Sequence, residues 1–419
     1  MDHFHYVSGV LNAEDVPLPV IAKQVGTPVY VYSRATLTRH ARVFRDALSI
    51  LPRVKIAFAV KSNPNLAVLK VLAAEGYGAD VVSGGEMDRA LAAGMPAEGV
   101  VFSGVGKTAK ELARALEAGI GQFNLESEEE GLELAEIAVR LGKVASCALR
   151  VNPDVDAGTH GKISTGKAEN KFGVPFDRAG AIYARLAETP GLAMRGLALH
   201  IGSQLSKLDP LEAAFTKVGG LMRDIRAGGH AVTHMDLGGG VGVPYKAGDV
   251  FPQPEEYAAM VARVTADWDV TLMFEPGRVI TGNTGVLVTE VVRVKEGVGN
   301  PWVVVDAAMN DLARPALYDA WHDFAAVTPR GEKITANIVG PICESSDTFA
   351  MARTIDVVQR GDLAVFRTAG AYGATMANTY NSRPLVPEVM VDGTNWAVVA
   401  DRIDPATILA AERVPDFLA

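Results

Sequence analysis

The chain has 419 residues, 48% hydrophobic and 21% charged, which is enough apolar material for a sizeable core. A net charge of −9 without a long basic block argues against nucleic acid as a partner, because phosphate binding needs clustered Lys and Arg. No apolar run approaches the roughly 20 residues of a membrane helix, and the N-terminus lacks a signal-peptide pattern. Two cysteines, Cys147 and Cys343, make no disulfide framework. We therefore expect a reduced, cytoplasmic protein with no membrane partner.

The first expected strand is "PVYVYS", residues 28–33. From residue 54, short apolar runs alternate with amphipathic stretches such as 65–76 and 109–119, which have helical spacing and a closing Gly. The eight apolar runs are 54–60, 78–85, 99–104, 121–127, 146–153, 194–202, 232–240 and 270–277. Their lack of period-2 alternation is typical of parallel strands buried on both faces. Eight strand–helix units predict an α/β fold with a (β/α)8 TIM-type barrel.

A loop rich in Gly, Lys and Asn, residues 156–173, follows the fifth run. It is long enough to be a mobile flap over an active site, and it equally fits an exposed insertion.

After residue 284 the pattern becomes β-rich, with no clear helices. The runs 285–297, 301–309, 334–343 and 362–370 predict a second, antiparallel β domain, which we expect strand 28–33 to join. The expected division is an N-terminal segment (1–34), a barrel (35–283) and a C-terminal β-rich domain (284–419).

The active site of such a barrel forms at the carboxyl ends of its strands. Polar residues there are Lys61, Asp80, Arg150, His200, Ser203, Asp236 and Glu275. Taken alone, Lys61 has two interpretations. It could be a charged residue where a strand reaches the surface, or an amine held in a pocket for chemistry. The residues expected at the same mouth favour the second interpretation.

Two glycine-bearing loops follow the last two barrel strands, "GGGVG" at 238–242 and "PGR" at 276–278. Loops at these positions often bind phosphate, because glycines let backbone N–H groups approach an anion. Two stretches match nucleotide-binding motifs only in part. Val101 stands where a P-loop requires glycine, and Val243 stands at the last glycine position of G-x-G-x-x-G. ATP and NAD are therefore disfavoured. No histidine or cysteine spacing indicates a metal site.

A phosphate site facing a lysine amine suggests pyridoxal phosphate. The aldehyde of this cofactor binds a lysine, and its ring nitrogen needs an acidic partner, for which Glu275 is well placed. His200 could stack on the ring, although a buried structural histidine is the alternative.

The motifs "FAVKSNP", "VVSGGE", "RVNPDVDAGTH", "HIGSQ", "DLGGGVG", "FEPGR", "DAAMNDLARPALY", "GPICESSD" and "AGAYG" together resemble the diaminopimelate decarboxylase family. These are fold-type III pyridoxal-phosphate enzymes, similar in plan to alanine racemase and ornithine decarboxylase. The resemblance runs from about residue 5 to about residue 410. It implies removal of CO2 from meso-2,6-diaminopimelate to give L-lysine, the last step of lysine biosynthesis.

The resemblance also implies roles for individual residues. Residues expected to bind the cofactor are Lys61, Asp80, His200, Ser203, Gly238, Gly239, Gly240, Glu275, Pro276, Gly277, Arg278 and Tyr372. Those expected to bind the substrate are Arg278, Arg314, Tyr318, Glu344 and Tyr372. The expected catalytic residues are Lys61, His200, Glu275 and Cys343, the last as proton donor, with Glu86 near the lysine.

In this family the positions of Cys343 and Glu344 enter the site from the partner subunit, which implies a homodimer. Two arginines suit a substrate with a distal carboxylate, since guanidinium binds carboxylate in a bidentate manner. Arg314 and Tyr318 are four residues apart and share a face if their segment is helical. Cys147, within a strand, is expected to be a buried apolar residue.

Three alternatives stay open from sequence. One is a decarboxylase or racemase of another amino acid. Another is a barrel aldolase that forms a Schiff base on Lys61 without a cofactor, which the β domain and "GGGVG" disfavour. The third is a binding protein that keeps the fold without catalysis, which the joint presence of Lys61, Glu275, Cys343 and Tyr372 disfavours.

Overall fold

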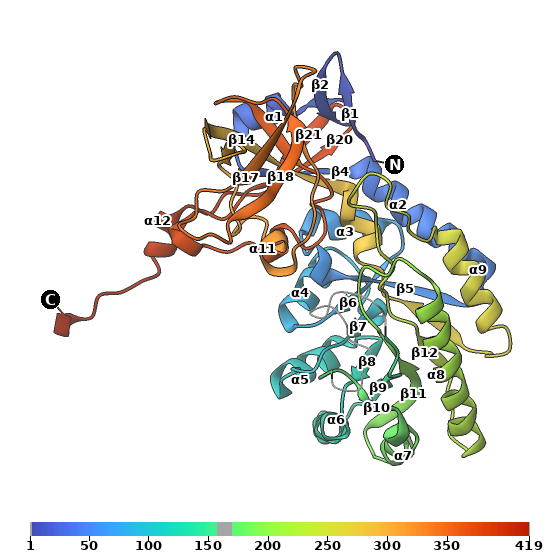
Figure 1. Ribbon diagram of the computed structural model, residues 1–419. Coiled ribbons are helices and arrows are strands. Elements are labelled where there is room, and N and C mark those ends of the chain that lie inside the picture. Colours follow the sequence, from blue (N-terminus) through green and yellow to red (C-terminus); the bar gives the residue numbers. More distant parts are fainter. Residues whose placement is uncertain (1, 157–169, 419) are drawn as a thin grey trace. The chain divides into compact units, whose positions relative to one another are not determined.

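A computed structural model describes residues 2–156 and 170–418 (Figure 1). Most of the predicted flap at 156–173 therefore lies outside the described residues. The chain divides into two compact units. A barrel unit comprises Thr38–Pro244 and Asp249–Ile280, and a β-rich unit comprises Met1–Leu37, Tyr245–Gly248 and Thr281–Ala419.

Eight parallel strands form the closed barrel of the first unit. They are β5 (Val54–Ala59), β6 (Gly78–Val81), β7 (Val100–Phe102), β8 (Gln122–Leu125), β9 (Ala145–Asn152), β11 (Leu192–Ala198), β12 (His234–Asp236) and β13 (Thr271–Phe274). Each strand pairs with the next, and β13 pairs with β5 to close the ring. A two-residue strand, β10 (Val174–Pro175), adds to β9. The predicted (β/α)8 barrel is confirmed.

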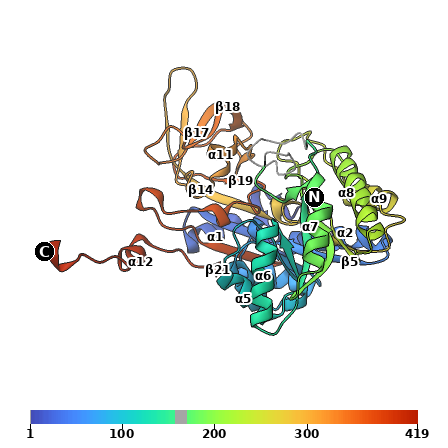
Figure 2. The same ribbon diagram turned by 90° about the horizontal axis from the view of Figure 1, so that it is seen from below.

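Amphipathic helices follow the barrel strands. They are α3 (Leu66–Ala74), α4 (Gly84–Ala92), α5 (Ala109–Ala118), α6 (Glu128–Arg140), α7 (Phe176–Ala187), α8 (Asp209–Ala227) and α9 (Pro254–Val264), with α2 (Arg34–Ala47) before the first strand. Consecutive helices from α5 to α9 pack side by side (Figure 2). Local chemistry fixes their ends: in α5, Thr108 and Glu111 form a capping box, and Gly119 ends the helix with φ 72°.

The β-rich unit contains a sheet of order β18-β17-β15-β14-β4-β20-β21, with β19 on β14 and β16 on β19. Its strands are β4 (Val29–Ser33), β14 (Gly285–Lys295), β15 (Trp302–Val305), β16 (Phe324–Ala326), β17 (Lys333–Val339), β18 (Thr348–Asp356), β19 (Leu363–Phe366), β20 (Glu388–Asp392) and β21 (Asn395–Ala400). The predicted joining of the N-terminal strand is confirmed, because β4 lies between β14 and β20. A core that includes Val29, Val31, Val286 and Val389 packs against it.

Two expectations for this unit were wrong. The sheet is mixed rather than antiparallel, because β4 runs parallel to β20 and β15 parallel to β17. Short helices are also present after residue 284, where none was expected: α11 (Arg314–Tyr318) and α12 (Pro405–Leu409). Helix α1 (Leu18–Val25) lies outside that region. A small sheet at the N-terminus was not anticipated; it consists of β1 (Phe4–Val7), β2 (Val10–Ala13) and β3 (Val16–Pro17).

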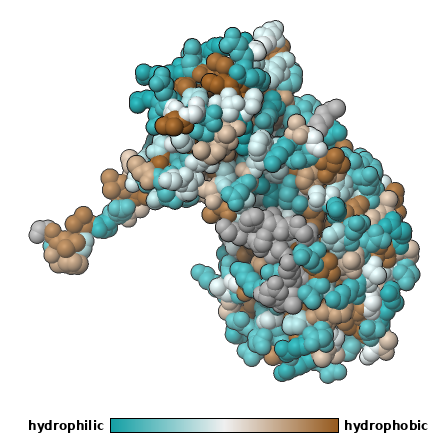
Figure 3. All heavy atoms as spheres, in the orientation of Figure 1, coloured by the Kyte–Doolittle hydropathy of each residue, from teal (hydrophilic) through white to brown (hydrophobic). Residues whose placement is uncertain are grey.

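The segment that includes α12 and follows it exposes large apolar side chains (Figure 3). Leu409, Val414, Phe417 and Leu418 are all exposed there. In residues 2–156 and 170–418, no helix combines the length and apolar character needed to cross a bilayer.

Candidate active site

Lys61 lies directly after the first barrel strand, in a short 3₁₀ turn (Val60–Ser62). The Ser62 hydroxyl donates back to the Ala59 carbonyl at 2.8 Å, which fixes the turn. The Lys61 amine donates to Oδ2 of Asp80, at the end of the second strand, at 2.5 Å. Asp80 is fully buried, and its Oδ1 has no hydrogen-bond partner among the described residues. The carboxylate therefore holds the amine and keeps one oxygen available for another donor.

Glu275 and Asp236 form a buried acid pair at the ends of β13 and β12. Asn124 donates to Oδ2 of Asp236 at 2.9 Å and to Oε1 of Glu275 at 3.3 Å. Burial raises the pKa of Glu275 well above its usual range, and the nearby carboxylates of Asp236 and Asp80 raise it further. Burial and mutual repulsion therefore favour the protonated form of this acid pair.

His200 follows β11 and is held as a neutral ring. Burial, followed by the positive charges of Arg150 and Lys61, lowers the pKa of His200 to about 3. Its Nδ1 accepts a hydrogen bond from the Gly239 N–H at 3.3 Å. A neutral imidazole at the barrel mouth suits stacking on a planar ring, as the sequence interpretation requires.

Glycines let the loops after β11, β12 and β13 meet. A Cβ on Gly238 would lie 2.4 Å from the Leu199 carbonyl oxygen, and one on Gly239 would lie 2.2 Å from that of Glu275. A Cβ on Gly240 would lie 2.4 Å from the Gly202 carbonyl oxygen. Close backbone packing thus requires all three glycines, a reason that sequence alone did not supply.

The residues predicted to hold phosphate come together in the barrel unit. The guanidinium of Arg278, which is buried, donates to the Ser203 hydroxyl from Nη2 at 3.1 Å. A Cβ on Gly277 would lie 3.1 Å from the Ala59 Cβ and 3.2 Å from the Ser62 Cβ, so this loop packs against the Lys61 turn. Pro276 accepts the Ala59 N–H through its carbonyl at 3.0 Å. The lysine and the glycine loops are therefore neighbours.

Arg314 is buried in the β-rich unit, at the start of α11. Its Nη1 lies 2.8 Å from Nε2 of His322, and its guanidinium stacks 4.6 Å from the centre of the Tyr245 ring. His322 is held in turn by the Arg367 carbonyl, 2.9 Å from its Nδ1. The segment is helical, so Arg314 and Tyr318 share a face of α11. Sequence identified Arg314 but missed the two rings that orient it.

Three further predicted residues lie in loops of the β-rich unit. Cys343 is exposed, and its N–H donates to Oδ1 of Asn381 at 3.4 Å. The Ser346 hydroxyl donates to Glu344, and this bond lowers the pKa of that exposed carboxyl group. Tyr372 adopts the left-handed backbone region with φ 55°, which is rare for a bulky side chain and concentrates at functional sites. In Cys147, by contrast, the thiol is fully buried and burial raises its pKa.

Sequence reasoning also missed Asn124 and the ion pair between Arg150 and Glu126, whose Nη1 and Oε1 are 2.7 Å apart. A usable signal was present. Gln122, Asn124 and Glu126 alternate with apolar residues in a strand expected to be buried, so their polar side chains share one face.

The barrel unit fits pyridoxal phosphate. It provides a lysine amine held by a carboxylate, an unpartnered buried oxygen on Asp80 and a buried acid for a ring nitrogen. Ser203, Arg278 and the glycine loops offer donors for a phosphate. Among the described residues, no group of three or more His, Cys, Asp or Glu side chains could hold a metal ion.

Comparison with known proteins agrees with this arrangement. Residues 34–282 match the pyridoxal-binding domain of pyridoxal-dependent decarboxylases. The chain is 51% identical over 420 residues to diaminopimelate decarboxylase of Zymomonas mobilis, and 48% identical over 417 residues to that of Vibrio cholerae; both alignments cover 99% of each chain. The structure of diaminopimelate decarboxylase from M. jannaschii in co-complex with L-lysine is 33% identical, with a TM-score of 0.96, covering 100% of this chain and 99% of that one. The chain therefore belongs to the diaminopimelate decarboxylase family of pyridoxal-dependent enzymes.

Proposed function

We propose that this chain removes CO2 from meso-2,6-diaminopimelate to give L-lysine, with pyridoxal phosphate as cofactor. The observation that carries the proposal is the lysine–carboxylate pair of Lys61 and Asp80 at a barrel mouth that also holds buried Glu275. L-Lysine, bound in the M. jannaschii relative, is the product that this reaction would release.

Each barrel residue has a role in this chemistry. Lys61 would hold the cofactor through its amine, which Asp80 orients. Glu275 keeps a proton at the ring nitrogen, and His200 packs its neutral ring against the cofactor plane. Ser203, Arg278 and the backbone of Gly238, Gly239, Gly240, Pro276 and Gly277 bind the phosphate. When bound, pyridoxal phosphate supplies a sink for the electron pair of the breaking Cα–carboxylate bond.

The β-rich unit supplies residues for the substrate. Arg314, already planar and fixed by His322 and Tyr245, suits the distal carboxylate, because an oriented guanidinium loses little side-chain entropy on binding. Tyr318 and Arg278 assist it, and Glu344 binds a substrate amine. Tyr372 contacts both cofactor and substrate. Cys343, whose thiol is exposed in the single chain, would supply the proton that Cα needs.

We also propose that the enzyme is a cytoplasmic homodimer in which Cys343 and Glu344 serve the site of the partner subunit. Both residues lie in an exposed loop, and the exposed apolar side chains near α12 are the kind of surface that subunit contacts cover. Two unpaired cysteines suit a reducing compartment. The domain bounds 1–34, 35–283 and 284–419 remain proposals.

The test is a product assay with meso-diaminopimelate, with and without added pyridoxal phosphate. The purified protein should carry the cofactor's visible absorbance and release L-lysine and CO2. Lys61→Ala should lose that absorbance and at least ~1000-fold in rate, because no other group can replace a covalent nucleophile. Lys70→Ala, at an exposed helix position, is the matched control.

A panel of ornithine, lysine and arginine in the same assay separates this substrate from those of related decarboxylases. Those amino acids lack a distal carboxylate and would leave the buried Arg314 without an anion. Activity on ornithine alone would refute the substrate, and a colourless protein that binds no pyridoxal phosphate would refute the mechanism.

A further inference from the structure

A second cavity lies within the barrel unit, at the opposite end of the strands from Lys61. Its volume is about 670 Å³, within the usual range for small-molecule sites. Residues from the start of the strands line it, including Lys55 of β5, Gly78 of β6, Gln122 of β8 and His234 of β12. The proposed active site uses none of them.

Small residues form part of the lining at this end of the barrel. Barrel interiors are normally packed with layers of bulky branched residues. Here a buried apolar cluster of Ala57, Val101 and Met273 lines the cavity. Gly78 and Ser146 line the same cavity, together with the larger polar side chains of Gln122 and His234.

The polar side of the cavity is positively charged. Lys55, Arg195 and His234 line it from three different strands, and no salt bridge involves them in the part of the chain that the structure describes. Burial lowers the pKa of His234, and the charges of Lys55 and Arg195 lower it further, so both cations act on the imidazole. Glu98 is the one carboxylate among the lining residues.

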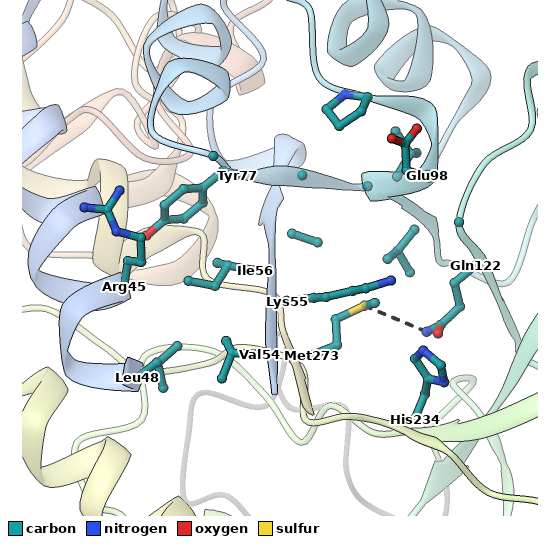
Figure 4. Close-up of a pocket in the computed structure, with 18 of the residues that line it drawn as sticks. Arg45, Leu48, Val54, Lys55, Ile56, Tyr77, Glu98, Gln122, His234 and Met273 are labelled. Carbon is teal, nitrogen blue, oxygen red and sulfur yellow. Dashed lines mark hydrogen bonds between the residues drawn. The ribbon is translucent and has the colours of Figure 1, made fainter. Parts of the chain in front are cut away.

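The other side of the cavity is apolar. Figure 4 shows Leu48, Val54 and Ile56 grouped with the Tyr77 ring, whereas Lys55, Gln122 and His234 lie together at the other side. The remaining lining cation, Arg45, already pairs with Glu75 at 3.2 Å. The lining thus combines two cations that make no salt bridge among the described residues, Lys55 and Arg195, with an apolar wall.

We propose that this cavity binds a small organic anion, with its carboxylate or phosphate at Lys55, Arg195 and His234 and an apolar chain against Leu48, Val54 and Ile56. An anion offsets the mutual repulsion of the cations, and the apolar wall gains from burial of the chain. A cationic ligand would be repelled by Lys55 and Arg195. A purely polar ligand would leave the apolar wall without a partner to bury.

The experiment is calorimetric titration of the enzyme loaded with pyridoxal phosphate, which occupies the anion site at the barrel mouth. The probes are hexyl phosphate, hexanoate, hexylamine and inorganic phosphate. Hexyl phosphate or hexanoate should bind at least ~10-fold more tightly than hexylamine, because the cavity cations repel the amine. Hexyl phosphate should exceed inorganic phosphate by at least ~10-fold through burial of its chain. The stronger of the two anions identifies the head group.

Lys55→Glu and Arg195→Glu should each weaken the anion at least ~5-fold, because an attraction becomes a repulsion. Lys110→Glu, the same change at an exposed position of α5 outside the cavity, should leave binding unchanged. Both cavity residues are exposed, so their variants should fold. Equal binding of hexylamine, no binding of either anion, or anion binding that neither charge reversal weakens would overturn the proposal.

Discussion

Burial and the neighbouring carboxylates Asp236 and Asp80 act on Glu275 more strongly than the opposing charge of Lys61, so the charged form of Glu275 is unfavourable. Its folded-state pKa is raised, chiefly by burial and then by Asp236. The stability that it contributes is therefore fully present at acid pH, below its unfolded pKa, and is lost as pH rises through the folded value. The acid is stored in its neutral form in the cofactor-free barrel.

Glu275→Gln, which cannot ionise, should flatten this dependence. The melting temperature of the cofactor-free variant should fall less between pH 5 and pH 9 than that of the unchanged protein. Its decarboxylation rate should drop roughly 100-fold, as expected when a proton-holding group is lost. Glu117→Gln, at an exposed position of α5, should change neither quantity, and a wild-type pH profile in Glu275→Gln would contradict the buried-acid assignment.

His200 gives a prediction of opposite sign. Its folded pKa is lowered to about 3, by burial first and then by Arg150 and Lys61. The stabilising contribution is present above the unfolded pKa of roughly 6.5 and is lost as pH falls toward the folded value. Between pH 6.5 and 4.5 the loss is about 2 kcal/mol, because the slope approaches 1.36 kcal/mol per pH unit only below the unfolded pKa.

His200→Asn should remove most of that loss, which urea unfolding at pH 7 and pH 4.5 measures directly. His5→Asn, which replaces an exposed imidazole, is the control and should retain the full acid sensitivity. If His200→Asn proves as acid-sensitive as the unchanged protein, the ring is charged in the folded state and does not have the neutral form that stacking needs.

Sequence located Lys61, Asp80, His200 and Glu275 at one barrel mouth because strand ends and loop glycines leave a local signal. It could not place Asn124 between two carboxyl groups, or His322 beside Arg314. The first contact joins residues distant in the chain: Asn124 and Asp236 are separated by 112 positions, yet their side chains are 2.9 Å apart. His322 is only 8 positions from Arg314, but it lies beyond the end of α11, so helical spacing does not predict their contact. The assigned roles of the site residues stay predictions until the variants are measured.

At the scale of elements, α8 contains adjacent glycines with opposite surroundings. A Cβ on Gly219 would lie 2.5 Å from Cζ2 of buried Trp268, whereas one on Gly220 would meet nothing within 4 Å. Gly220→Ala should stabilise the protein by about 0.5–1 kcal/mol through helix propensity. Gly219→Ala should destabilise it by about 1–3 kcal/mol through overpacking.

The two variants control each other, since they add the same methyl group to the same helix. Urea midpoints should therefore shift in opposite directions. Equal shifts would show that Trp268 moves freely, which its 1% exposure argues against.

The barrel strands were predictable because strands buried on both faces give continuous apolar runs, and the helices because their spacing and caps are local. The last strands were overestimated: 232–240 contains β12 only at His234–Asp236, because the glycines after it form a loop. The sheet of the other unit could not be resolved from sequence. Strand β4 pairs with β20, so Val31 pairs with Val389 across most of the chain, and nothing local sets that direction.

At the scale of the whole molecule, the proposed homodimer has a direct consequence. Lys61 and Cys343 belong to different units of one chain, and the proposal assigns them to a shared site only when they come from different subunits. Lys61→Ala and Cys343→Ala should each be nearly inactive when alone. A mixed dimer of the two variants would contain one site with both residues intact and one site with neither.

Mixing equal amounts of the two variants, unfolded and refolded together, should therefore restore about a quarter of the unchanged activity, since half the dimers are mixed and each has one intact site of two. The rate of L-lysine formation measures this recovery. Lys61→Ala refolded with Glu275→Gln is the matched control. Both changes lie in the barrel unit, so a mixed dimer contains no intact site and no recovery is expected. Absence of recovery in the first mixture, with dimers demonstrated by sedimentation, would place Cys343 in the site of its own chain, because each mixed site would then still lack one residue.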